Sequence, residues 1–245
     1  MPIAAKRGVS KAAFVSREGR AFAWVIPKVS RALLQAERPC AIVAHMLRWS
    51  LLALAYASMA GVAVAVSELW LEHSAWTYPN PWLHLPGYVG HAYSLAIGLA
   101  LGALVVVVTR RLVERFAWAQ ELANALRPFA RGLSGTSIVF VAVLSSLGEE
   151  LLFRGLLEPS LGLWLQALLF GLLHQMRGPS RWAWVGWASI IGLLFGIVFA
   201  STGSLLGPLA AHAVINGFNL NYLQNHDPDV SRRSLGGLFG QRSRA

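Results

Sequence analysis

The stretch GTSIVFVAVLSSLGEELLFRGLL, residues 135–157, is almost wholly apolar, yet it carries Glu149, Glu150 and Arg154 close together. A membrane span needs roughly 20 mostly apolar residues, so this stretch is long enough to cross a bilayer. Ionisable groups at membrane depth are costly, and they usually face a polar cavity and mark function. We therefore expect a transmembrane helix that carries part of a functional site.

The composition of the chain agrees with a membrane protein. Of its 245 residues, 56% are hydrophobic and 13% are charged, and the mean hydropathy is +0.52. Soluble domains have about 25% charged residues. The net charge of +10 is not gathered on a compact basic face with interleaved aromatic residues, which argues against a nucleic-acid partner. The single Cys40 excludes an intrachain disulfide framework and a cysteine metal cluster.

Apolar segments divide the chain into about six predicted spans, so we expect an all-α, polytopic helix bundle. The segments are residues 47–66, 91–109, 135–157, 161–174, 182–200 and 205–222. The fourth segment is short for a span. These segments predict a multi-pass protein of a bacterial inner (plasma) membrane, whose helices contact the lipid bilayer.

The basic residues predict the orientation of the spans. All but one of the 21 Lys and Arg residues lie up to residue 48, between 110 and 131, between 177 and 181, or after residue 231. The intervening connections carry Glu68, Glu72 and Glu158 instead. Because basic loops stay in the cytoplasm, both termini are expected there.

Four regions follow from this pattern. Residues 1–46 form a basic cytoplasmic tail, and residues 224–245 form a polar cytoplasmic tail. Residues 47–134 hold two spans and an amphipathic helix on the cytoplasmic surface, and residues 135–223 hold a core of four spans that carries the site.

The three charges of the third span divide into two roles. Glu150 and Arg154 are four residues apart, lie on one helix face and stand in the favourable order for an ion pair. Such a pair is far better tolerated in a low dielectric than either charge alone. Glu149 points elsewhere and has no local partner, which makes it a candidate general base.

Two later spans each add a histidine. Phe170 lies one turn before His174, and Asn216 lies one turn after His212, so His212 and Asn216 can act as a pair of donors. Pro208 is expected to kink the sixth span near His212. Either histidine alone could instead be a structural residue that bonds a backbone carbonyl. The joint occurrence of these residues on three spans, by contrast, favours a functional site.

The motifs Glu-Glu-x-x-x-Arg (149–154), Phe-x-x-x-His (170–174) and His-x-x-x-Asn (212–216), in this order, resemble those of the CPBP family of intramembrane proteases. The family includes the type II CAAX prenyl endopeptidases and the bacterial "Abi" or bacteriocin-processing proteins. The resemblance covers roughly residues 144–222.

The resemblance implies an intramembrane endopeptidase that hydrolyses a peptide bond of a membrane protein or peptide substrate. It assigns Glu149 and His174 to the activation of water, and His212 and Asn216 to the oxyanion hole. Glu150, Arg154 and Phe170 would organise the site. We expect no metal or other cofactor, and the alternative is a zinc ion held by Glu149, His174 and His212.

The turn at residues 158–162 carries Glu158 and no basic residue, which places this turn and the catalytic layer toward the outer face. That placement suits a sorting protease that trims C-terminal membrane anchors, as the myxosortase branch of the family does. Two alternatives belong to other classes: a non-enzymatic immunity or adaptor protein of the same fold, and a proton-coupled carrier.

Overall fold

The computed structural model describes residues 50–226, so the predicted tail 1–46 and nearly all of the tail 224–245 lie outside it. From Ala53 onward the described chain belongs to one compact unit. Its helices in chain order are Ser50–Leu69, α3 (Gly87–Arg115), α4 (Ala117–Arg131), α5 (Gly135–Glu150), the π-helix η1 (Leu151–Leu157), α6 (Glu158–Leu161), α7 (Leu163–Leu173), α8 (Arg181–Thr202) and α9 (Leu206–Asn225). Between residues 50 and 226 the β-structure is one isolated bridge, Thr77 with Ser204, so the all-α prediction is confirmed.

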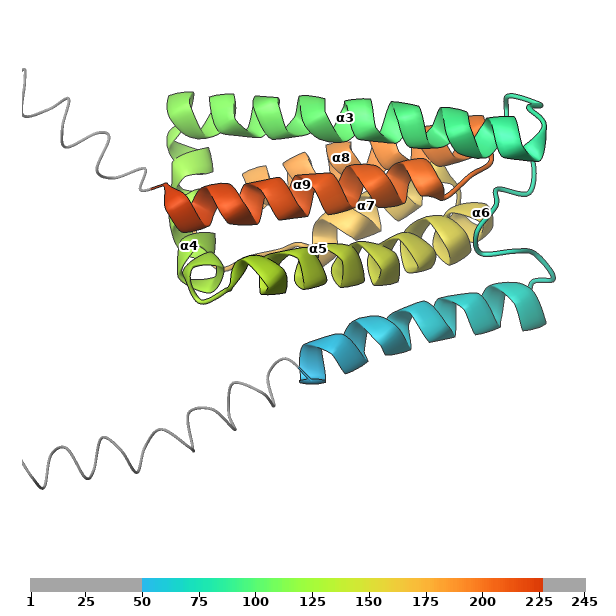
Figure 1. The fold of residues 1–245 in the computed structure, drawn as a ribbon, viewed down its shortest axis with the longest axis horizontal. Helices are drawn as coiled ribbons and strands as arrows, with labels where there is room; N and C mark the ends of the chain where they lie inside the picture. The colour runs from blue at the N-terminus through green and yellow to red at the C-terminus, as the bar shows by residue number, and fades with distance from the viewer. Residues whose placement is uncertain (1–49, 227–245) are drawn as a thin grey trace, which may run out of the picture. The chain divides into compact units, whose positions relative to one another are not determined.

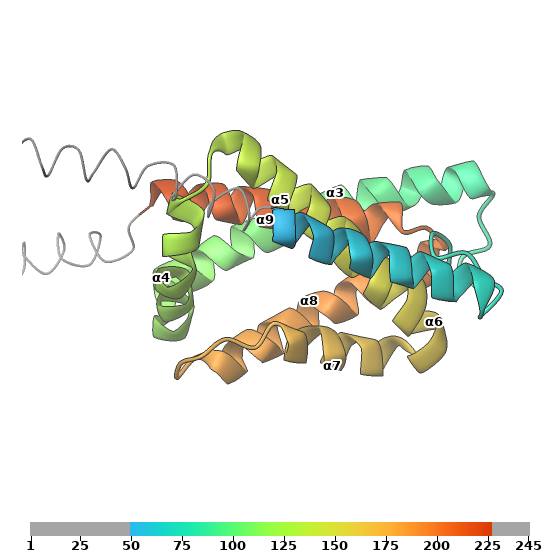
Figure 2. The same ribbon diagram turned by 90° about the horizontal axis from the view of Figure 1, so that it is seen from below.

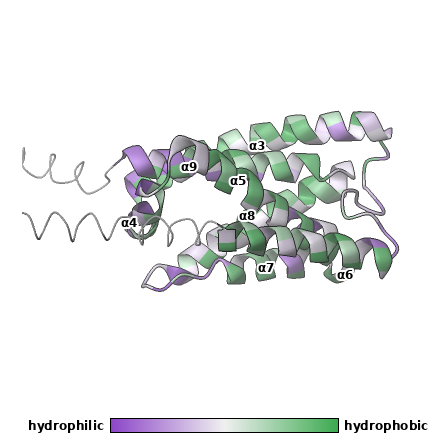
Figure 3. Ribbon diagram, turned by 60° about the horizontal axis from the view of Figure 1, so that its bottom comes forward, coloured by the Kyte–Doolittle hydropathy of each residue, from purple (hydrophilic) through white to green (hydrophobic). Residues whose placement is uncertain are grey.

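Four of these helices are long and apolar enough to cross a membrane: Ser50–Leu69, Gly87–Arg115, Gly135–Leu161 and Arg181–Thr202. Figure 3 shows apolar residues along α3, α5 and α8. The chain is therefore a multi-pass membrane protein. The helix α7 has 11 residues and is about 16 Å long, roughly half the thickness of the hydrocarbon core. The count of six spans stays a prediction.

Helices α3 and α9 lie side by side in the bundle (Figure 1). A Cβ atom added to Gly98 of α3 would collide with the backbone of Gly207 of α9. A Cβ atom on Gly102 would lie 3.1 Å from Cα of Ala211, one turn further along both helices. Small residues thus let the two backbones approach closely, as in many membrane helix pairs. This packing fixes the helix that carries His212.

Pro208 does not kink the helix near His212, contrary to the sequence prediction. It lies in the first turn of α9, where the missing N–H would have no helical partner in any case. The carbonyl of Ser204, which Pro208 cannot engage, accepts a hydrogen bond of 2.8 Å from Oγ of Ser94. Ser94 of α3 therefore supplies the hydrogen bond that the Ser204 carbonyl cannot receive from Pro208.

The third span is longer than predicted, and this changes the place of Glu158. The helix continues from α5 through η1 and α6 to Leu161, and the turn consists of Gly162 with a φ of 80°. Glu158 is fully buried. The prediction that Glu158 lies in a turn at residues 158–162 is wrong, because the helix runs on through Pro159 near the start of α6, where proline is tolerated. Glu149 lies roughly 18 Å from the end of this helix and therefore near its middle.

The predicted amphipathic helix between the second and third spans is present as α4. It begins at Ala117, because α3 continues to Arg115. Ala119, Ala123 and Ala130 of α4 are buried, and they pack in one cluster with Leu223 of α9. Figure 2 shows α4 at one end of the bundle, while α7 packs along α8.

Candidate active site

The carboxylate of Glu149 lies between the two histidines that the sequence singled out. Its Oε2 atom is 3.5 Å from Nε2 of His174 and 3.8 Å from Nε2 of His212. The Glu149 side chain is 13% exposed, and within residues 50–226 no hydrogen-bond partner reaches its Oε2 atom. The structure thus brings together three groups from α5, α9 and the end of α7, and it leaves one carboxylate oxygen available.

His174 follows the last residue of α7 and caps that helix. Its Nδ1 atom is 2.8 Å from the backbone oxygen of Phe170. A carbonyl oxygen can only accept, so Nδ1 carries the hydrogen and donates it. In the neutral ring Nε2 therefore has a free lone pair, which faces Glu149. The bond also explains the spacing of four residues, since a carbonyl and a side chain one turn apart meet on the same face.

His212 is anchored in the same way, by Glu150. Its Nδ1 atom is 2.6 Å from Oε1 of Glu150, and the same oxygen accepts a hydrogen bond of 3.0 Å from Arg154. Because this carboxylate already accepts from a guanidinium, we assign it as ionised and His212 as the donor. The predicted pair of Glu150 and Arg154 is confirmed, but Glu150 has a second partner that the sequence did not reveal.

Arg154 lies fully buried on η1, in an aromatic cage. Its guanidinium stands over the rings of Phe170 and Phe195, at 4.5 and 5.1 Å from their centres, and it donates to the backbone oxygen of Gly192 at 2.9 Å. π-Helical turns occur frequently at functional sites. Arg154 links η1 to α7 and α8, and Phe170 touches both Arg154 and the ring of His174.

Asn216 lies on the same side of α9 as His212, but its amide already has a partner. Its Nδ2 atom donates to Oγ of Ser145 on α5 at 3.1 Å. An amide nitrogen has two hydrogens, so one remains available for a substrate. The sequence drew no attention to Ser145, since serine is common in membrane helices and its neighbours are apolar.

Glu158 is a further buried carboxylate of this region. It follows Arg154 by four residues, and neither of its oxygens has a hydrogen-bond partner in the described part of the chain. A Cβ atom added to Gly196 of α8 would lie 2.7 Å from Oε2 of Glu158 and 2.6 Å from Nε2 of Gln166. The acidic side chain therefore points inward, toward α7 and α8, rather than into solvent.

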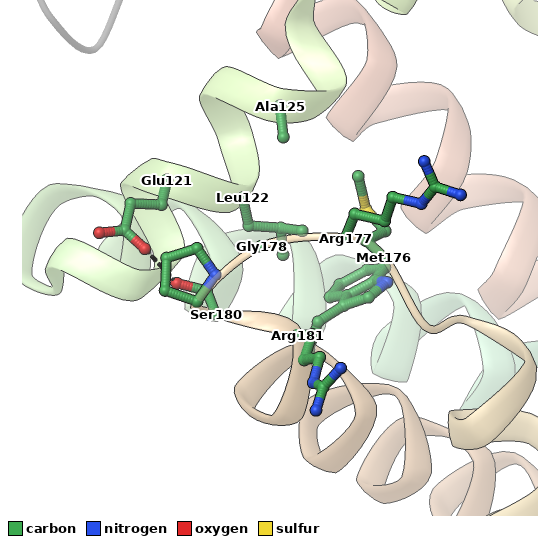
Figure 4. Close-up of a pocket in the computed structure, with 10 residues that line it drawn as sticks. Glu121, Leu122, Ala125, Met176, Arg177, Gly178, Ser180 and Arg181 are labelled. Atoms are coloured by element: carbon green, nitrogen blue, oxygen red, sulfur yellow. Dashed lines mark hydrogen bonds between the residues drawn. The ribbon is translucent and has the colours of Figure 1, made fainter.

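A cavity of about 140 Å³ lies between α4 and the loop that joins α7 to α8 (Figure 4). Its lining is mostly apolar and includes Leu122, Met176 and Trp184, and a contact between Ser180 and Glu121 lies at its edge. The ring of Trp184 is 6.0 Å from the ring of His174. The cavity therefore lies near His174, at the α4 end of the bundle.

One observation favours metal binding by Glu149, His174 and His212, and another argues against it. Each histidine donates through Nδ1 to an oxygen and turns Nε2 inward, which is how metal-binding histidines are usually held. Across the described residues, however, no group of three or more His, Cys, Asp or Glu side chains is close enough to hold a metal ion.

The fold and the site define a multi-pass α-helical membrane protein with a largely enclosed centre of one glutamate and two histidines, of which Glu149 and His174 are partly exposed. The family model described as "Type II CAAX prenyl endopeptidase Rce1-like" matches residues 132–218, which include α5 and most of α9. Residues 132–218 are therefore similar to the family that the motifs of this segment indicated.

Among curated proteins, the "Uncharacterized protein YpbD" of Bacillus subtilis (strain 168) is 38% identical over 79 residues. The match covers 32% of this chain and 41% of the relative, so the chain spans about two fifths of that protein's length. No solved structure matches the chain.

Proposed function

We propose that this protein is an intramembrane endopeptidase of the CPBP type, which hydrolyses a peptide bond in a membrane-associated or lipid-anchored protein. The observation that carries the proposal is the convergence of Nε2 of His174 and Nε2 of His212 on Oε2 of Glu149. The match of residues 132–218 to a family of prenyl endopeptidases supports the same reaction class.

Glu149 and His174 are suited to activate a water molecule. Both present a lone pair, on Oε2 and Nε2, and a water that bonds to both would donate both of its hydrogens. Attack of its oxygen on the scissile carbonyl carbon transfers one proton to Glu149. When the intermediate collapses, the C–N bond breaks and the leaving amine takes that proton, so the base returns to its initial state.

His212 and Asn216 are assigned to the developing oxyanion. Asn216 keeps one amide hydrogen beside its bond to Ser145, whereas His212 can donate through Nε2 only when its ring is protonated. The Glu150 carboxylate at Nδ1 stabilises that protonated ring. In this proposal Glu150 supports the donor, and Arg154 holds Glu150 in place.

Two observations bear on the substrate. The distribution of basic residues assigns the turn at Gly162 to the outer face, which would suit a protease that trims C-terminal sorting anchors. The cavity at the α4 end favours an approach from the side that the same charges assign to the cytoplasm, where a lipid-anchored protein would be presented. Glu149, His174 and His212 would carry out the same reaction on either class of substrate.

The test is quantitative membrane proteomics of a strain that lacks this protein. We expect at least one membrane-associated protein to accumulate uncleaved, and to be processed again when the wild-type chain is restored but not when Glu149→Gln is restored. Precursors that keep a C-terminal anchor identify the sorting substrate, and lipid-modified precursors identify the cytoplasmic one.

If no protein changes in processing, or if Glu149→Gln restores cleavage, the enzyme proposal is wrong. An adaptor or immunity protein would then give a phenotype that Glu149→Gln retains. A proton-coupled carrier would give uptake that depends on Glu149 without any change in processing.

We further propose that the reaction needs no metal. Should zinc bind, Glu149, His174 and His212 would hold it, and it would supply a Lewis acid and an activated water. We expect cleavage by the purified protein to be unchanged after dialysis against a strong zinc chelator, and elemental analysis to find no stoichiometric zinc. Loss of cleavage that added zinc restores, with one zinc per chain, would contradict this.

A further inference from the structure

Helix α7 contains one residue with an amide, hydroxyl or charged side chain, and this residue is Gln166. Its side chain is fully buried, whereas Trp164 and several leucines of the same helix are exposed. Gln166, Phe170 and His174 follow one another at intervals of four residues, so they lie in one row along the helix. The buried amide is therefore on the side of α7 that ends in the histidine of the candidate site.

The amide of Gln166 meets Arg154 at a single backbone carbonyl of α8. Its Nε2 atom donates to the oxygen of Gly192 at 3.3 Å, and the guanidinium of Arg154 donates to the same oxygen at 2.9 Å. The opposite orientation of the amide would turn its oxygen, which has no hydrogen to donate, toward this acceptor. The carbonyl of Gly192 thus links α7 to the helix η1 that carries Arg154.

Two glycines of α8 make room for the row of side chains on α7. A Cβ atom added to Gly192 would lie 3.0 Å from Cδ1 of Phe170. One added to Gly196 would lie 2.6 Å from Nε2 of Gln166. Since α7 packs along α8 (Figure 2), both side chains rest directly against the backbone of that helix.

The contribution of Gln166 to stability is small for a fully buried side chain. Its Oε1 atom has no hydrogen-bond partner among residues 50–226, and the bond from Nε2 is long for an N–H···O contact. A buried polar atom without a partner costs free energy, and an apolar side chain of the same shape can be neutral or stabilising in its place. What the amide adds is direction, because apolar contacts are non-directional and a hydrogen bond favours one alignment of the two helices.

We propose that Gln166 is a positioning residue for His174, which aligns α7 on α8 through the carbonyl of Gly192. This inference rests on the proposed function. His174 follows the last residue of α7, and its Nδ1 atom is bonded to the oxygen of Phe170, so its ring moves with the helix. The 3.5 Å between Nε2 of His174 and Oε2 of Glu149 joins α7 to α5 and therefore depends on where α7 lies.

The test is Gln166→Met, measured with the full-length protein in detergent or liposomes on a substrate found by proteomics. Methionine has a similar length but no donor, and the Gly192 carbonyl keeps its bond from Arg154, so the Tm should stay near that of the wild type. We expect kcat to fall about tenfold or more, because a misplacement of about 1 Å can cost about a hundredfold. KM should stay within about twofold, since the change affects the reacting groups rather than the binding of substrate.

A second measurement repeats Gln166→Met in the background of His174→Ala, where the residual kcat is compared with and without the glutamine. If Gln166 acts by placing His174, its replacement should lower kcat no further once that ring is gone. A role in general packing would instead lower kcat by the same factor in both backgrounds.

The control is Gln224→Met on α9. Gln224 also donates from Nε2 to backbone oxygens of another segment, those of Ala130 and Leu133 at the α4 end of the bundle. Its replacement removes a comparable contact between helices and should leave kcat within about twofold at a temperature below the Tm of every variant.

Wild-type kcat in Gln166→Met beside a strongly impaired His174→Ala would overturn the positioning role and leave the proposed function intact. A loss of kcat that is the same in the His174→Ala background, that only follows a lower Tm, or that Gln224→Met shows equally would also overturn it. Wild-type kcat in His174→Ala would instead count against the proposed function itself.

Discussion

Glu149→Gln should lower kcat about a thousandfold, within the range of about 10² to 10⁴ that general bases contribute. The amide has nearly the same shape as the carboxylate, so it can still fill the space between His174 and His212. It cannot take a proton from water, and it places a donor or a weaker acceptor where Oε2 now stands. The initial rate of substrate cleavage by the purified, membrane-inserted protein measures the effect.

The matched control for this variant is Glu114→Gln on α3. Glu114 is also a glutamate of a long helix, but it is exposed and pairs with Arg111 at the surface. Its replacement should leave the rate within about twofold, because exposed ion pairs contribute little. Equal rates in Glu149→Gln, Glu114→Gln and the wild type would show that Glu149 is not the base.

Arg154→Met should cause the largest loss of stability, about 3 to 5 kcal/mol in the free energy of unfolding. Methionine fills a similar volume, but it leaves the buried carboxylate of Glu150 without its ion-pair partner and removes the donor to the Gly192 carbonyl. The change also takes a cation away from the ring of Phe170. Thermal unfolding in detergent, followed by tryptophan fluorescence, measures the effect as a lower Tm.

Arg111→Met provides the comparison. The Arg111–Glu114 pair has a similar distance, 3.2 Å between nitrogen and oxygen, but the Arg111 side chain is mostly exposed. Its effect should not exceed about 1 kcal/mol. The double variant Arg154→Met with Glu150→Gln should recover part of the lost stability, because it no longer buries an unpaired charge. A Tm of Arg154→Met equal to that of Arg111→Met would contradict the buried-pair argument.

The sequence predicted the pairing of Glu150 with Arg154 because spacing within one helix fixes which side chains share a face. It also predicted that Glu149 would be the carboxylate left for chemistry. The prediction of a turn at residues 158–162 misplaced Glu158, because Pro159 lies near the start of α6 and only Gly162 ends the helix. The sequence also predicted a kink at Pro208. Pro208 instead lies in the first turn of α9, where proline is tolerated.

Other contacts could not be read from the chain because they join segments far apart in sequence. The bond of His212 to Glu150 spans 62 residues, and the bond of Asn216 to Ser145 spans 71. Tyr56 lies against Gly148 because a glycine lets the two helices approach closely, and neither residue type is distinctive in an apolar segment.

The residues alone thus determine an all-α membrane protein, the similarity of its core segment to a protease family and the set of polar side chains that its helices carry. All three depend on composition and on spacing within single helices. Only the tertiary structure decides how the three charges of residues 149–154 are used. Glu150 is shared between Arg154 and His212, Arg154 is caged by aromatic rings, and Glu149 is turned toward two histidines. The reason is physical: the direction of a buried side chain is set by the neighbouring helices that pack against it, and that packing follows from close approaches such as Gly98 with Gly207.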